Sequence, residues 1–143
     1  MRFSDSSAIV RLVVGEPSSA AVGSAYRQDP DILVWWGTAI ECVSAIAQYE
    51  RERKLTADQA EAALNNLNDL ARSWEEIQPI EAVRRSAVRV LRTHSLRAAD
   101  AIPLAAAPSG SEDRPDSLHF VTLDEHLGLA AQREGFQVID PAA

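Results

Sequence analysis

The sequence has little cysteine, little lysine and no long apolar run. Its single cysteine, Cys42, excludes an internal disulfide and a cysteine-rich metal site. No run approaches the roughly 20 apolar residues that span a bilayer. The apolar stretch 8–14 is interrupted by Arg11 and follows Asp5, unlike the core of a signal peptide. We therefore expect a soluble, cytoplasmic protein without a membrane segment.

Acidic residues outnumber basic ones by 21 to 14, which gives a formal net charge of −7. This balance argues against a protein that coats nucleic acid non-specifically. It does not exclude an enzyme that holds RNA through bound cations and a local basic patch. The length of 143 residues and the hydrophobic fraction of 46% fit one globular domain over residues 1–143.

Short apolar runs alternate with amphipathic segments along the chain. Predicted strands cover residues 2–4, 32–36, 119–122 and 136–139, and predicted helices cover about 8–14, 19–27, 38–53, 57–74, 80–91, 97–107 and 123–133. Residues 108–117 carry two prolines and a glycine, which predicts an inserted loop. The alternation predicts an α/β fold with a mainly parallel sheet between two layers of helices.

Three acidic residues lie close to the carboxyl ends of predicted strands. Asp5 follows the first strand, Glu41 opens the helix after the second, and Asp124 follows the strand that ends at Thr122. Ligands of parallel sheets bind beyond these strand ends. A fourth acid, Asp100, lies on an alanine-rich helical segment and needs a partner if it is buried.

Each of these acids except Asp100 also has a purely structural explanation. Asp5 can be a helix N-cap, and Glu41 can be the third-position acid of a capping box that Thr38 opens. Asp124 can be a first-turn acid that favours the helix dipole, with Thr122 opening a second capping box. Both interpretations of these acids remain open at this point.

Together, the four carboxylates suit one chemical purpose better than four separate ones. Mg²⁺ and Mn²⁺ prefer oxygen ligands, and such ions are held by a few carboxylates together with water and substrate phosphate. Four converging carboxylates without a cation would repel one another. We therefore interpret Asp5, Glu41, Asp100 and Asp124 as the catalytic, metal-binding acids of a phosphodiesterase site.

Four segments resemble the motifs of PIN-domain proteins. They are Met1–Val10, Thr38–Glu41, Leu96–Ala107 and Phe120–Leu127, and together they span nearly the whole chain. A domain of this length looks like a VapC-type toxin of a prokaryotic toxin–antitoxin pair. The resemblance implies a PIN-like three-layer α/β/α sandwich and a Mg²⁺- or Mn²⁺-dependent endoribonuclease. It also implies a homodimer that a cognate antitoxin holds inactive.

The resemblance assigns supporting roles as well. Ser6 would contribute hydrogen bonds, and Thr122 would orient Asp124 or a water molecule. Two features depart from the family pattern. Pro103 stands where the family usually has histidine or glutamine, and a proline removes a hydrogen bond within a helix. The predicted loop 108–117 is also longer than expected for the family.

Arg85, Arg89 and Arg92 share one face of the predicted helix 80–91 and its continuation. A solvated outer face and an RNA-backbone contact surface are the two competing interpretations. The acidic surface itself suits a basic segment of an antitoxin, including an arginine inserted among the carboxylates.

Two other functions use the same residues. A degenerate PIN fold could act as a binding module without catalysis, which Pro103 and the loop 108–117 motivate. A metal-dependent phosphatase or DNA nuclease could also use the same four acids.

Overall fold

In the computed structural model, residues 1–15, 20–111 and 114–141 are described. The elements follow one another along the chain in this order: β1 Arg2–Ser4, α1 Ser6–Val14, α2 Ala20–Gln28, β2 Ile32–Trp35, α3 Thr38–Arg51, α4 Ala57–Ala71, β3 Glu75–Ile77, α5 Glu81–Thr93, α6 Ala98–Gly110, the 3₁₀ helix η2 Pro115–Ser117, β4 His119–Val121, α7 Glu125–Arg133 and β5 Gln137–Ile139. The predicted α/β alternation is therefore confirmed. Within the described residues, no helix is long and apolar enough to cross a membrane.

The five strands form one sheet in the order β3-β2-β1-β4-β5, with parallel pairing throughout the described strands. Strand β1 lies in the centre, where Phe3 pairs with Leu33 of β2 and with Phe120 of β4. All strands therefore end at the same edge of the sheet. The edge strand β3 was missed by the sequence analysis, because two of its three residues are exposed glutamates that show no apolar pattern.

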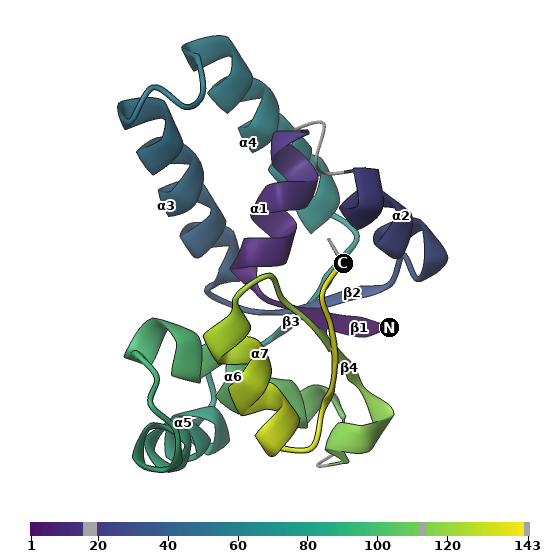
Figure 1. Cartoon of the computed structure of the whole chain (residues 1–143), viewed down its shortest axis with the longest axis vertical. Coiled ribbons are helices and arrows are strands. Elements are labelled where there is room, and N and C mark those ends of the chain that lie inside the picture. Colours follow the sequence, from purple (N-terminus) through teal and green to yellow (C-terminus); the bar gives the residue numbers. More distant parts are fainter. Residues whose placement is uncertain (16–19, 112–113, 142–143) are drawn as a thin grey trace.

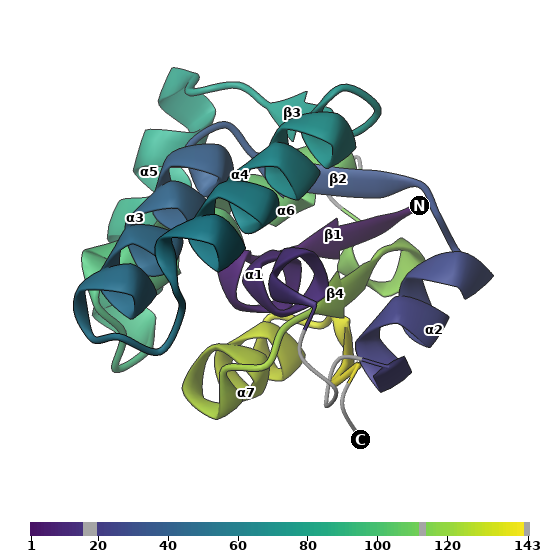
Figure 2. The ribbon, with the colours of Figure 1, turned by 90° about the horizontal axis from the view of Figure 1, so that it is seen from above.

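Helices cover both faces of the sheet, as Figures 1 and 2 show. Helices α1 to α4 lie on one face, and α5, α6 and α7 lie on the other. Successive strand residues point to opposite faces, so Phe120 joins one core cluster and Val121 joins the other. This arrangement confirms the three-layer architecture expected from the alternating elements.

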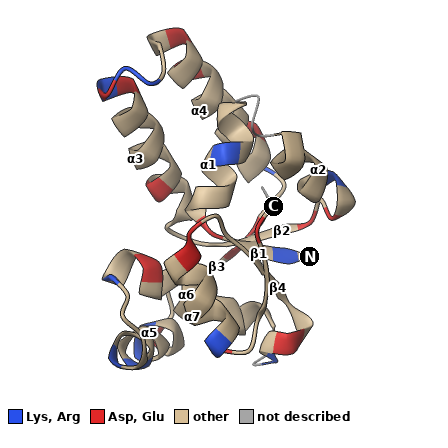
Figure 3. Ribbon diagram, viewed as in Figure 1, with Lys and Arg blue, Asp and Glu red and all other residues tan. Residues whose placement is uncertain are grey.

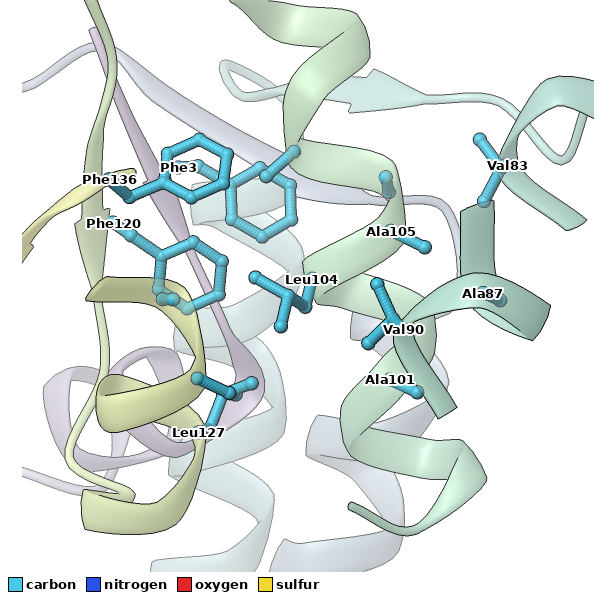
Figure 4. Packing of buried hydrophobic residues seen from close by; sticks show 14 of the residues in the cluster. Phe3, Val83, Ala87, Val90, Ala101, Leu104, Ala105, Phe120, Leu127 and Phe136 are labelled. Atoms are coloured by element: carbon cyan, nitrogen blue, oxygen red, sulfur yellow. The ribbon is translucent and has the colours of Figure 1, made fainter. Parts of the chain in front are cut away.

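The core beneath α5, α6 and α7 is built on aromatic rings of the sheet (Figure 4). The ring of Phe120 lies 5.2 Å from that of Phe3 and 5.7 Å from that of Phe136, measured between centroids. Leu104 of α6 and Leu127 of α7 pack against this group and are buried. The burial fixes the start of α6 and α7 relative to the strand ends.

Helix α6 differs from the predicted helix and loop. It continues to Gly110 instead of ending at Ala107, so the first residues of the predicted loop 108–117 are helical. Residues 115–117 form η2, and residues 112–113 lie outside the described part of the chain. Pro103 lies inside the continuous helix. The carbonyl group left without a partner by Pro103 belongs to the exposed Ala99, where water can satisfy it.

Candidate active site

The four acids predicted from the sequence lie at the carboxyl edge of the sheet. Asp5 follows the central strand β1, Asp124 follows β4, and Glu41 and Asp100 lie in the first turns of α3 and α6. Figure 3 shows acidic segments at the starts of α3, α6 and α7. Asp5, Asp100 and Asp124 line one pocket of about 340 Å³. Glu41 does not line this pocket but interacts electrostatically with Asp5 and Asp100.

Asp5 is the buried member of this group, with 5% of its surface exposed. Burial raises the pKa of its carboxyl group to about 6, and the nearby charge of Asp124 adds a smaller upward effect. Hydrogen bonds from the Ser7 hydroxyl (2.7 Å) and the Ala8 amide (3.4 Å) oppose the rise. Asp5 is thus the N-cap of α1, as the structural interpretation predicted, and also part of the acidic cluster.

Ser7 joins the ends of the two central strands, a role the sequence analysis missed. Its hydroxyl donates to Asp5 Oδ1, accepts from the Leu123 amide (2.9 Å) and lies 3.3 Å from Thr122 Oγ1. The position of Ser7 two residues after Asp5, in a cap sequence, was the only signal available from the chain.

Thr122 and Asp124 form the second half of this network. Thr122 Oγ1 accepts a hydrogen bond from the Asp124 amide (3.0 Å), and Asp124 Oδ1 accepts one from the Leu127 amide (3.0 Å). Asp124 is therefore the N-cap of α7, and the capping box proposed for Thr122 was wrong. The contact places Thr122 where it can orient Asp124, the role that the resemblance implied.

Glu41 does not take part in a capping box. The N-cap of α3 is Gly37, which makes no side-chain capping bond, so the box expected from Thr38 is also wrong. The buried Thr38 hydroxyl has no hydrogen-bond partner among the described residues. Glu41 instead accepts a hydrogen bond from Ser6, while burial and then the charges of Asp5 and Asp100 raise the pKa of its carboxyl group.

Asp100 faces the cluster even though Pro103 lies one turn later in α6. Burial raises the pKa of Asp100, and the charge of Asp124 raises it further. Arg97 and His126 act in the opposite direction. Asp100 thus lies in the same pocket as Asp5 and Asp124.

The donor set of this site fits a hard cation. All four side chains offer carboxylate oxygens, and their mutual repulsion would be relieved by positive charge. Within the described residues, however, no set of three or more His, Cys, Asp or Glu side chains is arranged to hold a metal ion as it stands. The carboxylates would therefore have to move together to bind a cation.

One of the three arginines that share a face of α5 forms an ion pair. Arg89 pairs with Glu134, which also contacts His94 Nε2 at 3.0 Å. Arg85 and Arg92 line a shallow pocket of about 420 Å³ beside Arg89 on α5. The pair with Glu134 supports the structural interpretation for Arg89, and RNA contact by this face stays a prediction.

Solved structures share this architecture over nearly their full length. FitAcB from Neisseria gonorrhoeae matches with a TM-score of 0.68 and 18% identity, covering 99% of this chain and 98% of that one. A toxin–antitoxin complex from Klebsiella pneumoniae matches with a TM-score of 0.63 and 17% identity, with the same coverage. PAE2754 from Pyrobaculum aerophilum gives 0.60 and 22%, covering 96% and 87%. The chain has a PIN-like fold.

At these identities, the matches show a shared fold alone, and the site must be argued from the chain's own residues. No family model and no curated protein matches the sequence. The expected fold class is confirmed by the parallel sheet, the two helical layers and the structural matches. The arrangement of the four acids in this structure is therefore the main evidence on their function.

The buried carboxyl group of Asp5 generates a pH-dependent prediction for the metal-free protein. A pKa that rises from 3.8 to about 6 on folding means that the folded state binds the proton more tightly. Ionisation of Asp5 therefore costs stability as the pH rises from about 4 to above 6, by up to about 3 kcal/mol. We expect Asp5→Asn to be more stable than the wild type at pH 7.5 in EDTA, with a difference that shrinks toward pH 4. Urea denaturation across this range measures it, and a difference that does not change with pH would contradict it.

Proposed function

We propose that this PIN-like chain is a metal-dependent endoribonuclease and the VapC-type toxin of a toxin–antitoxin pair. The observation that carries the proposal is the convergence of Asp5, Asp100 and Asp124 in one pocket, with Glu41 coupled to them electrostatically. The four-motif resemblance and the fold shared with a toxin–antitoxin complex support the toxin role.

The four carboxylates would hold Mg²⁺ or Mn²⁺. When bound, such an ion activates a water molecule for attack on phosphorus and stabilises the leaving oxygen. The chain's own residues prepare the ligands for this. Ser7 and Ala8 hold one oxygen of Asp5, Ser6 holds Glu41, and the Leu127 amide holds Asp124. These contacts set the direction of each carboxylate before a cation arrives.

In the absence of a cation, Asp5 takes up a proton as the pH falls through about 6. Its carboxyl group, with a pKa of about 6, is partly protonated near neutral pH, which reduces the repulsion within the cluster. Cation binding would release this proton, because a metal ligand must be deprotonated. Metal affinity should therefore rise with pH through the same range.

An exposed apolar groove supports the homodimer. Ile80, Val88 and Leu91 are 53%, 56% and 39% exposed, and they line a groove of about 320 Å³ together with Trp35 and Ile102. A contiguous exposed apolar patch of this kind often marks a site where another protein binds. We assign this groove to the contact with a second copy of the chain.

The acidic pocket supports the antitoxin as a partner. A basic segment of such a protein could place an arginine among Asp5, Asp100 and Asp124, where it would replace the cation as the positive charge. The same contact would explain inhibition, because it occupies the ligands that the reaction needs.

Asparagine variants of the acids test the metal-dependent nuclease. We expect Asp5→Asn and Asp100→Asn each to lose Mn²⁺ binding in calorimetry and to lower RNA cleavage by at least about 100-fold, since a neutral amide is a poor ligand for a hard cation. The matched control is Asp69→Asn, which changes an exposed aspartate at the end of α4 and should keep full activity. Wild-type activity in both site variants, or cleavage that persists in EDTA, would overturn the proposal.

The same assay separates the competing functions. Equal turnover of DNA, or turnover of a phosphomonoester instead of RNA, would favour a DNA nuclease or a phosphatase. Mn²⁺ binding no stronger than that of a variant lacking all four carboxylates would favour a degenerate binding module.

A charge placed in the apolar groove tests the homodimer. We expect the wild type to sediment as a dimer and Val88→Glu to sediment as a monomer, because a glutamate would be desolvated at the interface. Leu129→Glu is the control, since Leu129 is 47% exposed on α7 and does not line the groove. A wild-type monomer, or a dimer that survives Val88→Glu, would exclude this contact.

Co-expression tests the antitoxin. We expect a small open reading frame directly upstream to encode a DNA-binding N-terminal part and a basic tail, and its product to co-purify with the chain and suppress RNA cleavage. Replacing the arginines of that tail should restore cleavage. Co-purification without inhibition would contradict an arginine inserted among the carboxylates.

A further inference from the structure

A second cleft adjoins the acidic pocket. It has a volume of about 510 Å³ and is lined by Ser95, Leu96, Arg97, Asp100, Asp124 and His126. Asp100 and Asp124 line both cavities, so the carboxylates separate two ends of a longer groove. The proposed function uses the first end and assigns no role to the residues of the second.

The second cleft carries positive charge opposite the acids. Arg97 and His126 are exposed, and both lie near enough to Asp100 to lower the pKa of its carboxyl group. Neither forms a salt bridge within 4.0 Å in the part of the chain that the structure describes. Arg84 and Arg89, by contrast, are held by glutamates. The guanidinium group of Arg97 and the imidazole of His126 are therefore available to a ligand.

Two different elements place these side chains. Arg97 is the N-cap residue of α6, and its carbonyl oxygen accepts hydrogen bonds from the amides of Asp100 (3.1 Å) and Ala101 (2.9 Å). His126 lies in the first turn of α7, two residues after its N-cap Asp124. Arg97 and His126 therefore each belong to the helix start that also carries a site carboxylate, Asp100 in α6 and Asp124 at α7. The starts of α6 and α7 therefore fix where these two side chains lie relative to the carboxylates.

We propose that Ser95, Arg97 and His126 form a subsite for the phosphate next to the scissile phosphate of an RNA strand. The guanidinium group donates to phosphate oxygens, and the imidazole N–H and the serine hydroxyl can each donate one more hydrogen bond. The strand then runs across the carboxylates from one cavity into the other. This inference rests on the proposed function, because it takes the scissile phosphate to lie at the acids.

A competing explanation is that Arg97 and His126 only offset the negative charge of Asp100. The two explanations predict different results when the side chains of Arg97 and His126 are removed. If they only offset charge, their loss strengthens the attraction of the acids for Mn²⁺ and leaves RNA contacts unaltered. If they bind a phosphate, their loss weakens RNA binding and removes one ionic contact from its salt dependence.

The experiment measures binding of a short fluorescein-labelled single-stranded RNA by anisotropy, without added divalent cation, across a range of salt concentrations. The Asp5→Asn chain serves as the background so that binding is read independently of cleavage. We expect Arg97→Gln and His126→Gln each to weaken binding by about tenfold. For Arg97→Gln, which removes a full charge, the slope of log affinity against log salt should fall by about 0.7. Arg72→Gln, at an exposed arginine that lines neither cavity, is the control and should leave both values unchanged.

Calorimetry of Mn²⁺ binding to Arg97→Gln and His126→Gln without the Asp5 change completes the test. An unchanged salt slope in Arg97→Gln, or tighter Mn²⁺ binding with unaltered RNA affinity, would overturn the subsite. A background chain that binds no RNA would overturn it as well. Failure of the proposed function has a different signature, because the wild-type chain would then neither bind Mn²⁺ nor cleave RNA.

Discussion

Burial of a carboxylate at the end of the central strand is the constraint around which this molecule is arranged. In a parallel sheet, all strands end at the same edge, and β1 lies between β2 and β4. Asp5 follows β1 directly, and its amide donates to the carbonyl oxygen of Val121 on β4 (3.1 Å). The side chain is buried there, with 5% of the residue's surface exposed. Its charge must therefore be balanced locally, by hydrogen bonds, by a proton or by a cation.

Ser7 is the centre of this local balance. Its hydroxyl is shared between Asp5 and the Leu123 amide, so the end of β1 and the connection from β4 to α7 are held by one side chain. Thr122 then holds the amide of Asp124. Asp5 and Asp124 are thus each oriented by groups at the start of their own helix. Helix capping and ligand orientation are consequently not alternatives at Asp5 and Asp124, because in each residue Oδ1 caps the helix and the second oxygen makes no capping bond.

The sequence predicted the layers and the position of the four acids at one edge of the sheet, and its predictions failed where tertiary contacts decide the structure. The apolar runs and helical periodicity predicted the strands beside β1 and most of the helices. Strand β3 was invisible because an exposed edge strand of Glu75-Glu76-Ile77 buries too little to show a pattern. The Thr38 pattern predicted a capping box, yet its hydroxyl is buried without a partner and Glu41 accepts from Ser6 instead. Such choices depend on contacts between segments distant in the chain, which local spacing does not contain.

The net charge of −7 limits how this chain can engage a polyanion. Long-range attraction is absent, so recognition must come from cations placed at short range against the strand. Many of its basic groups are used elsewhere, as in the pairs of Arg2 with Asp29 and Arg89 with Glu134. Arg97 and His126 differ because they act on Asp100, an acid of the cluster itself, which a metal ion would neutralise. Cation binding at the acids and phosphate binding beside them would then support each other, since each removes charge that opposes the other.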